Sequence, residues 1–509
     1  MKLAHRTIQN ALFNVGGWVF PLVVSFVFTP YIVKMLGTSA YGVLTIVWSV
    51  IGYFTFLDLG LGQAVTKFVA EAMGCGDVKK ANHAIGAALL VSAVLGTFGG
   101  CVIFLLSGVL ARHWLNVPVE MTAAAILAFR IGAVGFVIGM FHTMCRATLR
   151  GLNRYDVTSL ITVMSSMFAT VGTAALLFLR CSLPHIVLLN VGVQLLATLI
   201  FIAAAVRIAS GLRVAPVTNR EALRQMLQFG LFATLSRAAY TALRHFDRVV
   251  IAAILGVSAV TFCVVPMMFV DRIAALALEI SNVIFPVVSE LQGRQREAAL
   301  AELYLTANRV MTVLSTALCV PLLVFGQRLL ALWMGDDFAA QTGFIVVLAT
   351  LGAMLNNLTN IPSFTADGLG KPQVTGLFAI SAAVLYFALM LPLARVWGIN
   401  GVALANTLCG AILTPLFVWY VTRRVLGMSG WRLWREALVG PYSLGLLLLL
   451  LLRLVPQHAI TNILVLLVVM GLSSLAYLVT AMVTGVCASR ERDAILGYLR
   501  LMQARLQGI

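Results

Sequence analysis

The sequence predicts an all-α polytopic membrane protein with about fourteen transmembrane helices, arranged as two parallel six-helix lobes followed by two C-terminal helices. The composition, the number of long apolar runs and an internal repeat support this fold class. Of the 509 residues, 61% are hydrophobic and only 10% are charged, and the mean hydropathy is +1.00. A soluble domain is usually about a quarter charged, so this composition is typical of a chain that lies in a bilayer.

Fourteen apolar runs are long enough to cross a membrane, because a transmembrane helix needs about 20 apolar residues. The first run follows a polar N-terminus and is expected to remain as the first span, since no secretory signal peptide precedes it. The connecting segments are short, which leaves no separate extramembrane domain. The predicted spans are residues 11–33, 42–70, 83–110, 121–145, 156–179, 184–206, 227–254, 259–288, 303–327, 340–366, 373–394, 399–421, 437–455 and 460–486.

An internal repeat relates the two halves of the chain. At an offset of 219, Leu36–Ala40 matches Leu255–Ala259, and Trp114 matches Trp333. At the same offset, Val69, Glu71 and Gly74 match Val288, Glu290 and Gly293, respectively. Residues 151–160 match 368–377 at an offset of 217. Because each repeat holds six helices, an even number, both halves start on the same side of the membrane. The repeat therefore predicts parallel lobes, and such a duplication is typical of a transporter with its site between two like halves.

Lys and Arg are unevenly distributed between alternate loops. With the N-terminus inside, 22 of them, among them Arg146 and Arg150, fall in cytoplasmic segments and 6 fall in external ones. Cytoplasmic loops carry this excess, so both termini are predicted to be cytoplasmic. Most of the formal net charge of +17 thus reflects topology and does not indicate nucleic acid. The predicted domains are an N-lobe at 1–215, a C-lobe at 216–425, helices 13 and 14 at 426–489 and a cytoplasmic amphipathic tail at 490–509.

Eleven charged residues lie inside the predicted spans, where each ionised group costs at least about 2.5–3.5 kcal/mol. Such a residue should face a wet cavity, a partner or the membrane interface. The seven cations exceed the four acids by 7 − 4 = 3, which suits an anionic cargo better than a self-neutralising network. They are Lys67, Arg130, Arg237, Arg244, Arg248, Arg272 and Arg309, with Asp58, Asp247, Asp271 and Glu279.

Three arginines form one stripe along the seventh predicted span. Arg237, Arg244 and Arg248 are spaced at i, i+7 and i+11, which places them on one helix face. The planar guanidinium group matches phosphate oxygens, so the stripe is a candidate pyrophosphate-binding site. Two other interpretations remain open: Asp247 could neutralise Arg244, and Arg248 could lie near a helix end and reach the interface.

Arg130, Arg272 and Arg309 are the other candidate substrate-binding residues of a central cavity. Arg272 and Glu279 share a face of the eighth span, next to Asp271, so these acids either pair internally or titrate with a coupling cation. Arg130 and Arg309 are isolated in their spans. A carbonyl or carboxylate partner is therefore as good an interpretation for them as the cargo.

Asp58 precedes Gly60 and Gly62 in the middle of the second span. Two glycines weaken a helix, and a carboxylate beside loosened backbone could hold Na⁺ or a proton. A simple bend explains the glycines equally well. The candidates for ion coupling or internal pairing are thus Asp58, Asp247, Asp271 and Glu279. No cofactor is expected beyond a coupling H⁺ or Na⁺, and no metal site, because the eight cysteines are scattered without a C-x-x-C motif.

Catalytic motifs are missing from the sequence. Gly370-Lys371 lacks the upstream glycine and the following Ser or Thr of a P-loop, and neither H-E-x-x-H nor G-x-S-x-G occurs. A membrane polymerase or ligase would need a substantial external loop, whereas the external loops here are of ordinary length, about a dozen residues or fewer. The sequence therefore predicts a transporter that is not an enzyme.

Four motifs together resemble a known family. They are Leu36-Gly37 leading to Tyr41-Gly42, Asp58-Leu59-Gly60-Leu61-Gly62 followed by Val69-Ala70-Glu71, Gly368-Leu369-Gly370-Lys371-Pro372, and Gly398-Ile399-Asn400-Gly401-Val402-Ala403. These resemble the polysaccharide transporter family, the Wzx-type flippases of the multidrug/oligosaccharidyl-lipid/polysaccharide exporter superfamily. The resemblance covers nearly the whole chain.

This resemblance implies transport of an undecaprenyl-pyrophosphate-linked oligosaccharide from the cytoplasmic to the outer leaflet of a bacterial plasma membrane. The product would be a surface polysaccharide (O-antigen, capsule or exopolysaccharide), and the mechanism would be alternating access driven by membrane potential or an ion gradient. The implied partners are the lipid-linked oligosaccharide and membrane lipids, with a polysaccharide polymerase and a chain-length regulator as further candidates and no nucleic acid. Two alternatives share the fold: a lipid II flippase, although the first span lacks an arginine-rich stretch, and a cation-coupled multidrug exporter, which would need an acidic cavity.

Overall fold

The computed structural model describes residues 23–58, 60–209, 211–215, 220–224, 247–282 and 284–486. Regular secondary structure in these ranges is entirely helical, so the predicted fold class is confirmed. The chain divides into two compact units, Met1–Thr261 and Phe262–Ile509. The lobe boundaries at residues 215 and 425 stay a prediction, and the predicted tail at 490–509 lies outside the described residues.

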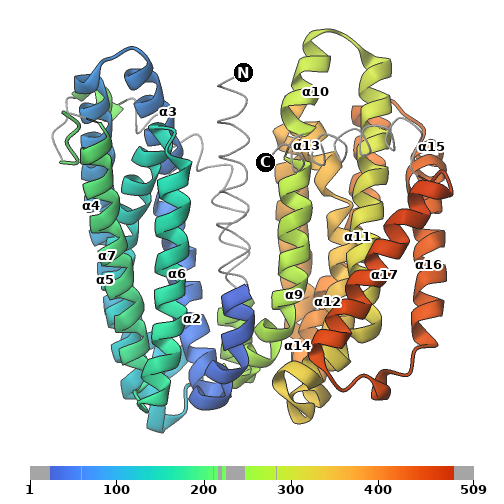
Figure 1. Cartoon of the computed structure of the whole chain (residues 1–509), viewed down its shortest axis with the longest axis horizontal. Helices are drawn as coiled ribbons and strands as arrows, with labels where there is room; N and C mark the ends of the chain where they lie inside the picture. Colours follow the sequence, from blue (N-terminus) through green and yellow to red (C-terminus); the bar gives the residue numbers. More distant parts are fainter. Residues whose placement is uncertain are drawn as a thin grey trace, which may run out of the picture. The chain divides into compact units, whose positions relative to one another are not determined.

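The first unit is a bundle in which α4, α5, α6 and α7 run side by side (Figure 1). Its core contains many small side chains, such as Ala64, Ala84, Ala88 and Ala147, which let the helix backbones approach closely. The helices are Val23–Leu36, α2 (Thr38–Phe54), the 3₁₀ turn η1 (Thr55–Asp58), α3 (Leu61–Gly74), α4 (Val78–Val109), the π-helical turn η2 (Leu110–Trp114), α5 (Val119–Gly151), α6 (Tyr155–Phe178) and α7 (Leu183–Ile208).

The second unit is built around α11, which packs against α12, α16 and α17. This helix is the most deeply buried candidate span of the described chain, consistent with a central position in the unit. Its helices are α9 (Val257–Ser281), which begins in the first unit, α10 (Ile284–Gly293), α11 (Glu297–Met334), α12 (Asp336–Asn357), α13 (Asn360–Gly368), α14 (Pro372–Tyr420), the π-helical turn η3 (Val421–Val425), α15 (Gly430–Leu433), the π-helical turn η4 (Trp434–Leu438), α16 (Val439–Arg453), the 3₁₀ turn η5 (Gln457–Ala459) and α17 (Ile463–Val483).

Eleven helices in the described part of the chain are long and apolar enough to cross a membrane. The longest, Pro372–Val425, holds two predicted spans that meet at Gly398, where φ is 58° and the backbone is not helical. The helix Val23–Leu36 and the helical residues 247–255 cover parts of the first and seventh predicted spans. Each of the fourteen predicted spans therefore coincides, wholly or in part, with a described helix.

The second predicted span is interrupted. α2 ends in the 3₁₀ turn η1, and α3 begins after Gly60, whose φ of 66° lies in the left-handed region that favours glycine. The weakness predicted at the glycines is thus a break in the helix directly after Asp58. The eighth and tenth predicted spans are divided in a similar way, into α9 with α10 and α12 with α13.

The repeat seen in the sequence is also a repeat of turn geometry. Twelve of the described residues with positive φ form six pairs related by nearly the same offset, and all have φ between 45° and 101°. The pairs are Gly37 with Gly256, Gly76 with Gln295 and Asn116 with Gly335 at 219, Asn153 with Gly370 at 217, Arg180 with Gly398 at 218, and Gly211 with Gly427 at 216. Glycine occupies both positions in only some pairs, so the turn is preserved where the residue type is not.

Helix packing is repeated as closely as the turns. A Cβ atom added at Gly151 would lie 2.9 Å from Cβ of Val69 and 3.0 Å from a carbonyl oxygen of α3. A Cβ atom added at Gly368 would lie 2.8 Å from Cγ1 of Val288 and 3.0 Å from a carbonyl oxygen of α10. Val69 and Val288 are themselves matched at an offset of 219. The repeated glycines therefore mark equivalent contacts between helix backbones in the two units.

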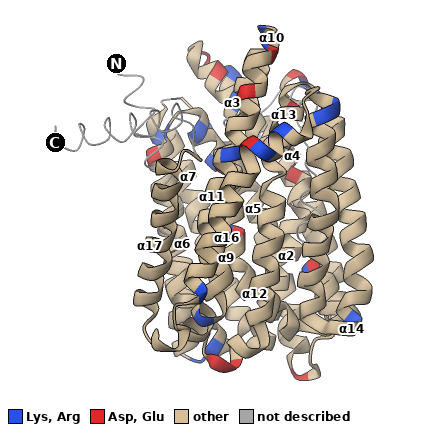
Figure 2. Ribbon diagram, turned by 90° about the vertical axis from the view of Figure 1, so that its right-hand side faces the viewer, with Lys and Arg blue, Asp and Glu red and all other residues tan. Residues whose placement is uncertain are grey.

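Charged residues lie mostly toward the ends of the helices, and the middle of each helix is largely uncharged (Figure 2). The helix of the fourth predicted span is longer than predicted. The predicted span ends at residue 145, but α5 continues to Gly151 and contains Arg146 and Arg150. Their place on the cytoplasmic side stays a prediction. No proline or glycine occurs between residues 140 and 150 to end the helix sooner. Both side chains are partly buried.

Candidate functional site

A partly buried group of charged side chains lies in the first unit, where the break in the second span meets α5. Asp58 is the last residue of η1, and the next helix starts three residues later, at Leu61. The backbone N–H of Gly62, in the first turn of α3, lies close to the carboxyl group of Asp58. One carboxylate oxygen, Oδ1, is buried and has no hydrogen-bond partner among the described residues.

Arg146 lies near this carboxylate. Its guanidinium group interacts electrostatically with both Asp58 and Arg150. Nε of Arg150 is buried and, like Oδ1 of Asp58, has no hydrogen-bond partner within the described chain. Such unpaired buried groups cost about 1–3 kcal/mol each and are rare in native proteins. Two cations and one acid leave a local excess of one positive charge, so the group favours an additional anion.

Packing between α3 and α5 holds these arginines in place. Oγ1 of Thr66, in α3, donates a hydrogen bond to the carbonyl oxygen of Ala147 at 3.2 Å. The close contact at Gly151 lies one residue beyond Arg150. A side chain at residue 151 would separate the two helices, so the small residue is what positions the last turn of α5 against α3.

α5 carries further polar residues in the turns before Arg146. His142 and Thr143 precede it by four and three residues, which places them on the same side of the helix. Nδ1 of His142 lies 3.2 Å from Oγ1 of Thr198 in α7, and its ring meets that of Phe201 edge-on at 5.2 Å between centroids. The polar strip of α5 is therefore packed against α7 and does not face lipid.

Arg248 is the one residue of the predicted arginine stripe that the structure describes. Its guanidinium NH1 donates to Oγ of Ser49 in α2 at 3.2 Å, and its charge acts on Tyr41, one turn after the start of α2. Its backbone N–H donates to Oδ1 of Asp247 at 2.7 Å. Arg248 thus belongs to the first unit. Arg237 and Arg244 lie outside the described residues.

A cavity of about 150 Å³ lies in the first unit between the helix Val23–Leu36, α2, α6 and α7. Tyr41, the neighbour of Arg248, is one of its walls. The wall is mixed, with an indole, a phenol, hydroxyl groups and an amide. Its polar and aromatic residues include Thr29, Tyr41, Trp48, Thr170, Thr173 and Asn190.

None of the other described site residues is among those that line this cavity. The guanidinium group of Arg130 stacks 4.9 Å above the ring of Phe104, and both side chains are exposed. Nε of Arg309 donates to the carbonyl oxygen of Glu436 at 2.7 Å. Glu279 accepts from Asn282 at 3.5 Å. Asp271 and Arg272 lie in α9 and are exposed in the described structure.

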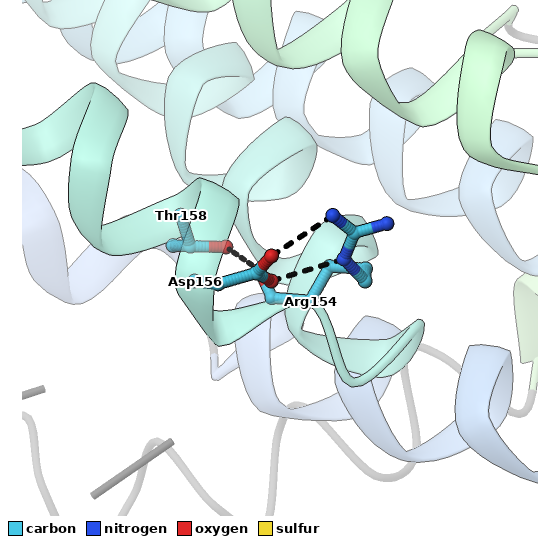
Figure 3. Close-up of polar contacts among 3 residues, drawn as sticks. All are labelled: Arg154, Asp156 and Thr158. Carbon is cyan, nitrogen blue, oxygen red and sulfur yellow. Dashed lines mark hydrogen bonds and ion pairs between the residues drawn. The ribbon is translucent and has the colours of Figure 1, made fainter. Parts of the chain in front are cut away.

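The turn after α5 contains an arginine, Arg154, whose charge is paired locally. Arg154 donates from Nε and NH2 to the two carboxylate oxygens of Asp156, at 2.9 Å each (Figure 3). The hydroxyl group of Thr158 donates to the backbone carbonyl oxygen of Arg154 at 2.9 Å. This bidentate pair neutralises Arg154 at the start of α6. Arg154 is thus satisfied within its own turn, whereas Nε of Arg150, four residues earlier, has no hydrogen-bond partner among the described residues.

Sequence reasoning missed Arg146 and Arg150 as site residues because it ended the fourth span at residue 145, and it did not single out His142 within that span. A detectable signal was present: His142, Arg146 and Arg150 recur every four residues, in helical register with the span before them. In α7, Asn190, Gln194 and Thr198 recur at the same spacing. Paired polar strips at helical spacing in two spans indicate that those faces meet.

Comparison with known proteins gives the family. A family model described as "Polysaccharide biosynthesis protein" matches residues 7–292. A putative O-antigen transporter of Shigella flexneri is 21% identical over 426 residues, which is 82% of this chain and 98% of that protein. The uncharacterized membrane protein EpsK of Bacillus subtilis is 23% identical over 450 residues, covering 84% of this chain and 85% of that protein.

Solved structures with the same fold are transporters. The lipid II flippase MurJ in an inward closed conformation has a TM-score of 0.71 at 12% identity, covering 92% of this chain and 98% of that one. An inward-facing multidrug resistance MATE family transporter of the MOP superfamily has a TM-score of 0.68 at 16% identity, covering 81% and 98%. These likenesses show the fold, and the family model spans more than half of the sequence. The chain therefore belongs to the polysaccharide biosynthesis protein family, with the multi-pass membrane fold of MOP superfamily transporters.

Proposed function

We propose that the protein is a flippase that moves an undecaprenyl-pyrophosphate-linked oligosaccharide from the cytoplasmic to the outer leaflet of a bacterial plasma membrane. It would act without chemistry on its cargo, by alternating access, with both termini in the cytoplasm. The family match and the putative O-antigen transporter among its relatives support a cargo used for surface polysaccharide. A polymerase and a chain-length regulator would then act on the delivered product.

The observation that carries the proposal is the cationic group on α5. Arg146 and Arg150 are partly buried, one guanidinium nitrogen lacks any partner among the described residues, and Asp58 offsets only one of the two charges. A pyrophosphate offers several acceptor oxygens and about two negative charges, which would satisfy these donors by charge-assisted hydrogen bonds. A cationic drug would instead be repelled by the net positive charge.

Arg248 provides a second proposed phosphate contact, beside the cavity of the first unit. In the proposal, a sugar ring would stack on Trp48 or Tyr41 while its hydroxyl groups meet Thr29, Thr173 or Asn190. From their spacing in the sequence, Arg237 and Arg244 are expected on the same helix face as Arg248 and would extend this contact. Arg130, Arg272 and Arg309 stay in the proposal as secondary cargo contacts.

A physical estimate explains how transport could proceed without ATP. Moving about two negative charges outward through an inside-negative potential of about 100 mV is favourable by roughly 4–5 kcal/mol, at ~2.3 kcal/mol per charge. A proton or Na⁺ on Asp58, Asp247, Asp271 or Glu279 could reset the empty carrier. Among these, Asp58 has the strongest structural support, because its buried oxygen Oδ1 lies beside the helix break.

The test is a flipping assay on the full chain in proteoliposomes. A fluorescent undecaprenyl-pyrophosphate-linked oligosaccharide is incorporated, and an added membrane-impermeant quencher reports the fraction in the outer leaflet with time. Protein should speed flipping of this lipid above protein-free vesicles, and an imposed potential of the expected sign should increase the rate. Arg248→Gln should reduce the rate, and Arg453→Gln, a change near the end of α16, should not.

Two results would contradict the proposal. Faster flipping of lipid II than of the oligosaccharide lipid would assign the protein to peptidoglycan precursors instead. Efflux of a cationic dye driven by a proton or Na⁺ gradient, with no flipping of either lipid, would assign it to drug export.

A further inference from the structure

A tryptophan- and arginine-rich connection links α14 to α16 in the second unit. It consists of the π-helical turn η3, the short helix α15 and the π-helical turn η4. Met428, Leu433 and Ala437 are buried in a cluster that also holds Tyr304 of α11. The residues between these three point the other way. We name the segment 428–437 the Trp-Arg turn.

The outward side of the Trp-Arg turn is strongly aromatic. Trp431 is 65% exposed and Trp434 is 50% exposed, and their rings stack at 4.8 Å between centroids with an interplanar angle of 25°. Trp419 near the end of α14 is 47% exposed, and a Cβ atom added at Gly430 would lie 3.8 Å from its Cδ1 atom. Large exposed indoles directly between two transmembrane helices are typical of the bilayer interface, where one edge is apolar and the other is wet.

The same side is cationic. Arg423, Arg424, Arg432 and Arg435 are all exposed, and Glu436 is the only acid between residues 421 and 438. Arg432 Nε donates to Oε1 of Glu436 at 3.0 Å, so one charge is neutralised. Residues 421–438 thus keep a net charge of 4 − 1 = +3.

The turn is held in a fixed geometry by α11. Nε of Arg309 donates to the backbone carbonyl of Glu436 at 2.7 Å. The hydroxyl group of Tyr304 lies 3.0 Å from Oγ1 of Thr422, at the start of the connection. These contacts and the buried Leu433 hold the backbone on its buried side. Little conformational entropy of the turn therefore remains to be lost when a ligand binds the exposed side.

We propose that the Trp-Arg turn is a binding site for an anionic glycerophospholipid of the leaflet that the positive-inside rule assigns to the cytoplasm. Trp431 and Trp434 would lie at the level of the lipid carbonyl groups, Arg435 would contact the phosphate, and Arg432, Arg423 and Arg424 would add to the positive charge that attracts it. An acidic protein segment would satisfy the arginines but would leave the stacked indoles without the apolar acyl chains that they suit. This lipid site is independent of the cargo and of the cationic group on α5.

The first experiment measures lipid retention. The full chain is delipidated in detergent and titrated with phosphatidylglycerol or phosphatidylcholine, and bound lipids are counted by native mass spectrometry. Each basic residue near an anionic surface contributes about a fivefold increase in affinity, so R432Q/R435Q should weaken phosphatidylglycerol binding by about 25-fold. R432K/R435K should keep most of it, and Arg453→Gln, near the end of α16, should match wild type.

The second experiment places the lipid at the tryptophans. Brominated phosphatidylglycerol quenches indoles that it contacts, and the emission lost in W431F/W434F isolates these two residues. Brominated phosphatidylglycerol should quench them more than brominated phosphatidylcholine, and R432Q/R435Q should remove the difference. Equal quenching by both lipids, or binding that R432Q/R435Q leaves unchanged, would overturn the proposal. Competition by millimolar inorganic phosphate would likewise overturn it, by assigning the site to free phosphate.

Discussion

The end of α5 in the first unit and α13 in the second unit occupy equivalent places in the repeat, but only the first carries the charged group. The turns and helix contacts match: Gly151 and Gly368 each press against the helix before them. The charges do not match. At offsets of 219 and 217, Asp58 corresponds to Ala277, His142 to Thr359, Arg146 to Ser363 and Arg150 to Asp367.

This comparison separates what a fold requires from what a function requires. Where two backbones touch, only a small residue fits, so both copies retain it. A charge inside a span brings no packing benefit and costs free energy, so it persists only where something uses it. Asp367 shows a charge that is used locally, because it accepts a hydrogen bond from Thr375 in its own unit.

The largest effect is expected from placing a charge in the copy that lacks one. Ala277 is 6% exposed and packs in an apolar cluster, with no described arginine at the equivalent of Arg146. Ala277→Asp should therefore destabilise the protein by about 2.5–3.5 kcal/mol. Thermal unfolding in detergent, with Ala277→Asn as the control for size and polarity, measures the effect. Equal destabilisation by the two substitutions would show that charge is not the difference between the copies.

The next effect is expected from removing charge where it is present. Arg146→Gln and Arg150→Gln together should reduce lipid-linked oligosaccharide flipping about 30-fold, which corresponds to about 2 kcal/mol lost from charge-assisted hydrogen bonds. Arg154→Gln is the matched control, because its guanidinium group is paired with Asp156 in the same turn. Its rate should stay within about twofold of wild type. A double variant that flips at the wild-type rate would remove α5 from the cargo path.

A smaller and symmetric effect is expected at the repeated contacts. Gly151→Ala and Gly368→Ala should each lower stability by about 1–2 kcal/mol, because the new methyl group meets a carbonyl oxygen at 3.0 Å in both units. Gly74 and Gly293 are another repeated pair, and a Cβ atom added at either would have no neighbouring atom within 4 Å. Gly74→Ala and Gly293→Ala should therefore be neutral or stabilising. The melting temperatures of the four variants test this, and a loss confined to one unit would show that the packing is not equivalent.

The smallest effect is expected at two surface ion pairs, Lys80 with Glu71 and Arg294 with Glu290. Lys80 donates to Glu71 at 3.0 Å and holds the pKa of Glu71 below its ordinary value by that hydrogen bond and its charge. A depressed folded-state pKa contributes stability above the unfolded value of about 4.3, and this is lost as the pH falls through the lower folded value. Glu71→Gln should thus remove a small part of the acid-induced fall in melting temperature. Glu290→Gln, at the equivalent pair with Arg294, is the comparison. If Glu71→Gln leaves the acid profile unchanged, the pair is without thermodynamic effect.

The fold could be predicted from the sequence because bilayer thickness fixes the length of each apolar run and because the repeat preserves its turns. The left-handed turn at Gly370 and its partner at Asn153 lie in the loop motif that the sequence already showed to be duplicated. The charged group on α5 was harder to predict. Hydropathy ended the fourth span just before Arg146, whereas hydrogen bonding continues the helix to Gly151. Whether Arg146 meets Asp58 depends on the packing of α5 against α3, which periodicity within one helix does not encode.

The paired turns at Asn116 and Gly335 also record where the two copies have changed length since their duplication. The offset is 219 at this turn and 217 through the helical stretch that follows, since Val119 corresponds to Asp336 and Gly151 to Gly368. The helical stretches that follow, Val119–Gly151 and Asp336–Gly368, both contain 33 residues. The two-residue deletion or insertion therefore fell in the short connection before them. A connection of this kind tolerates a change in length, but a helix that must match the membrane does not, so evolutionary gaps accumulated between spans and left the spans in register.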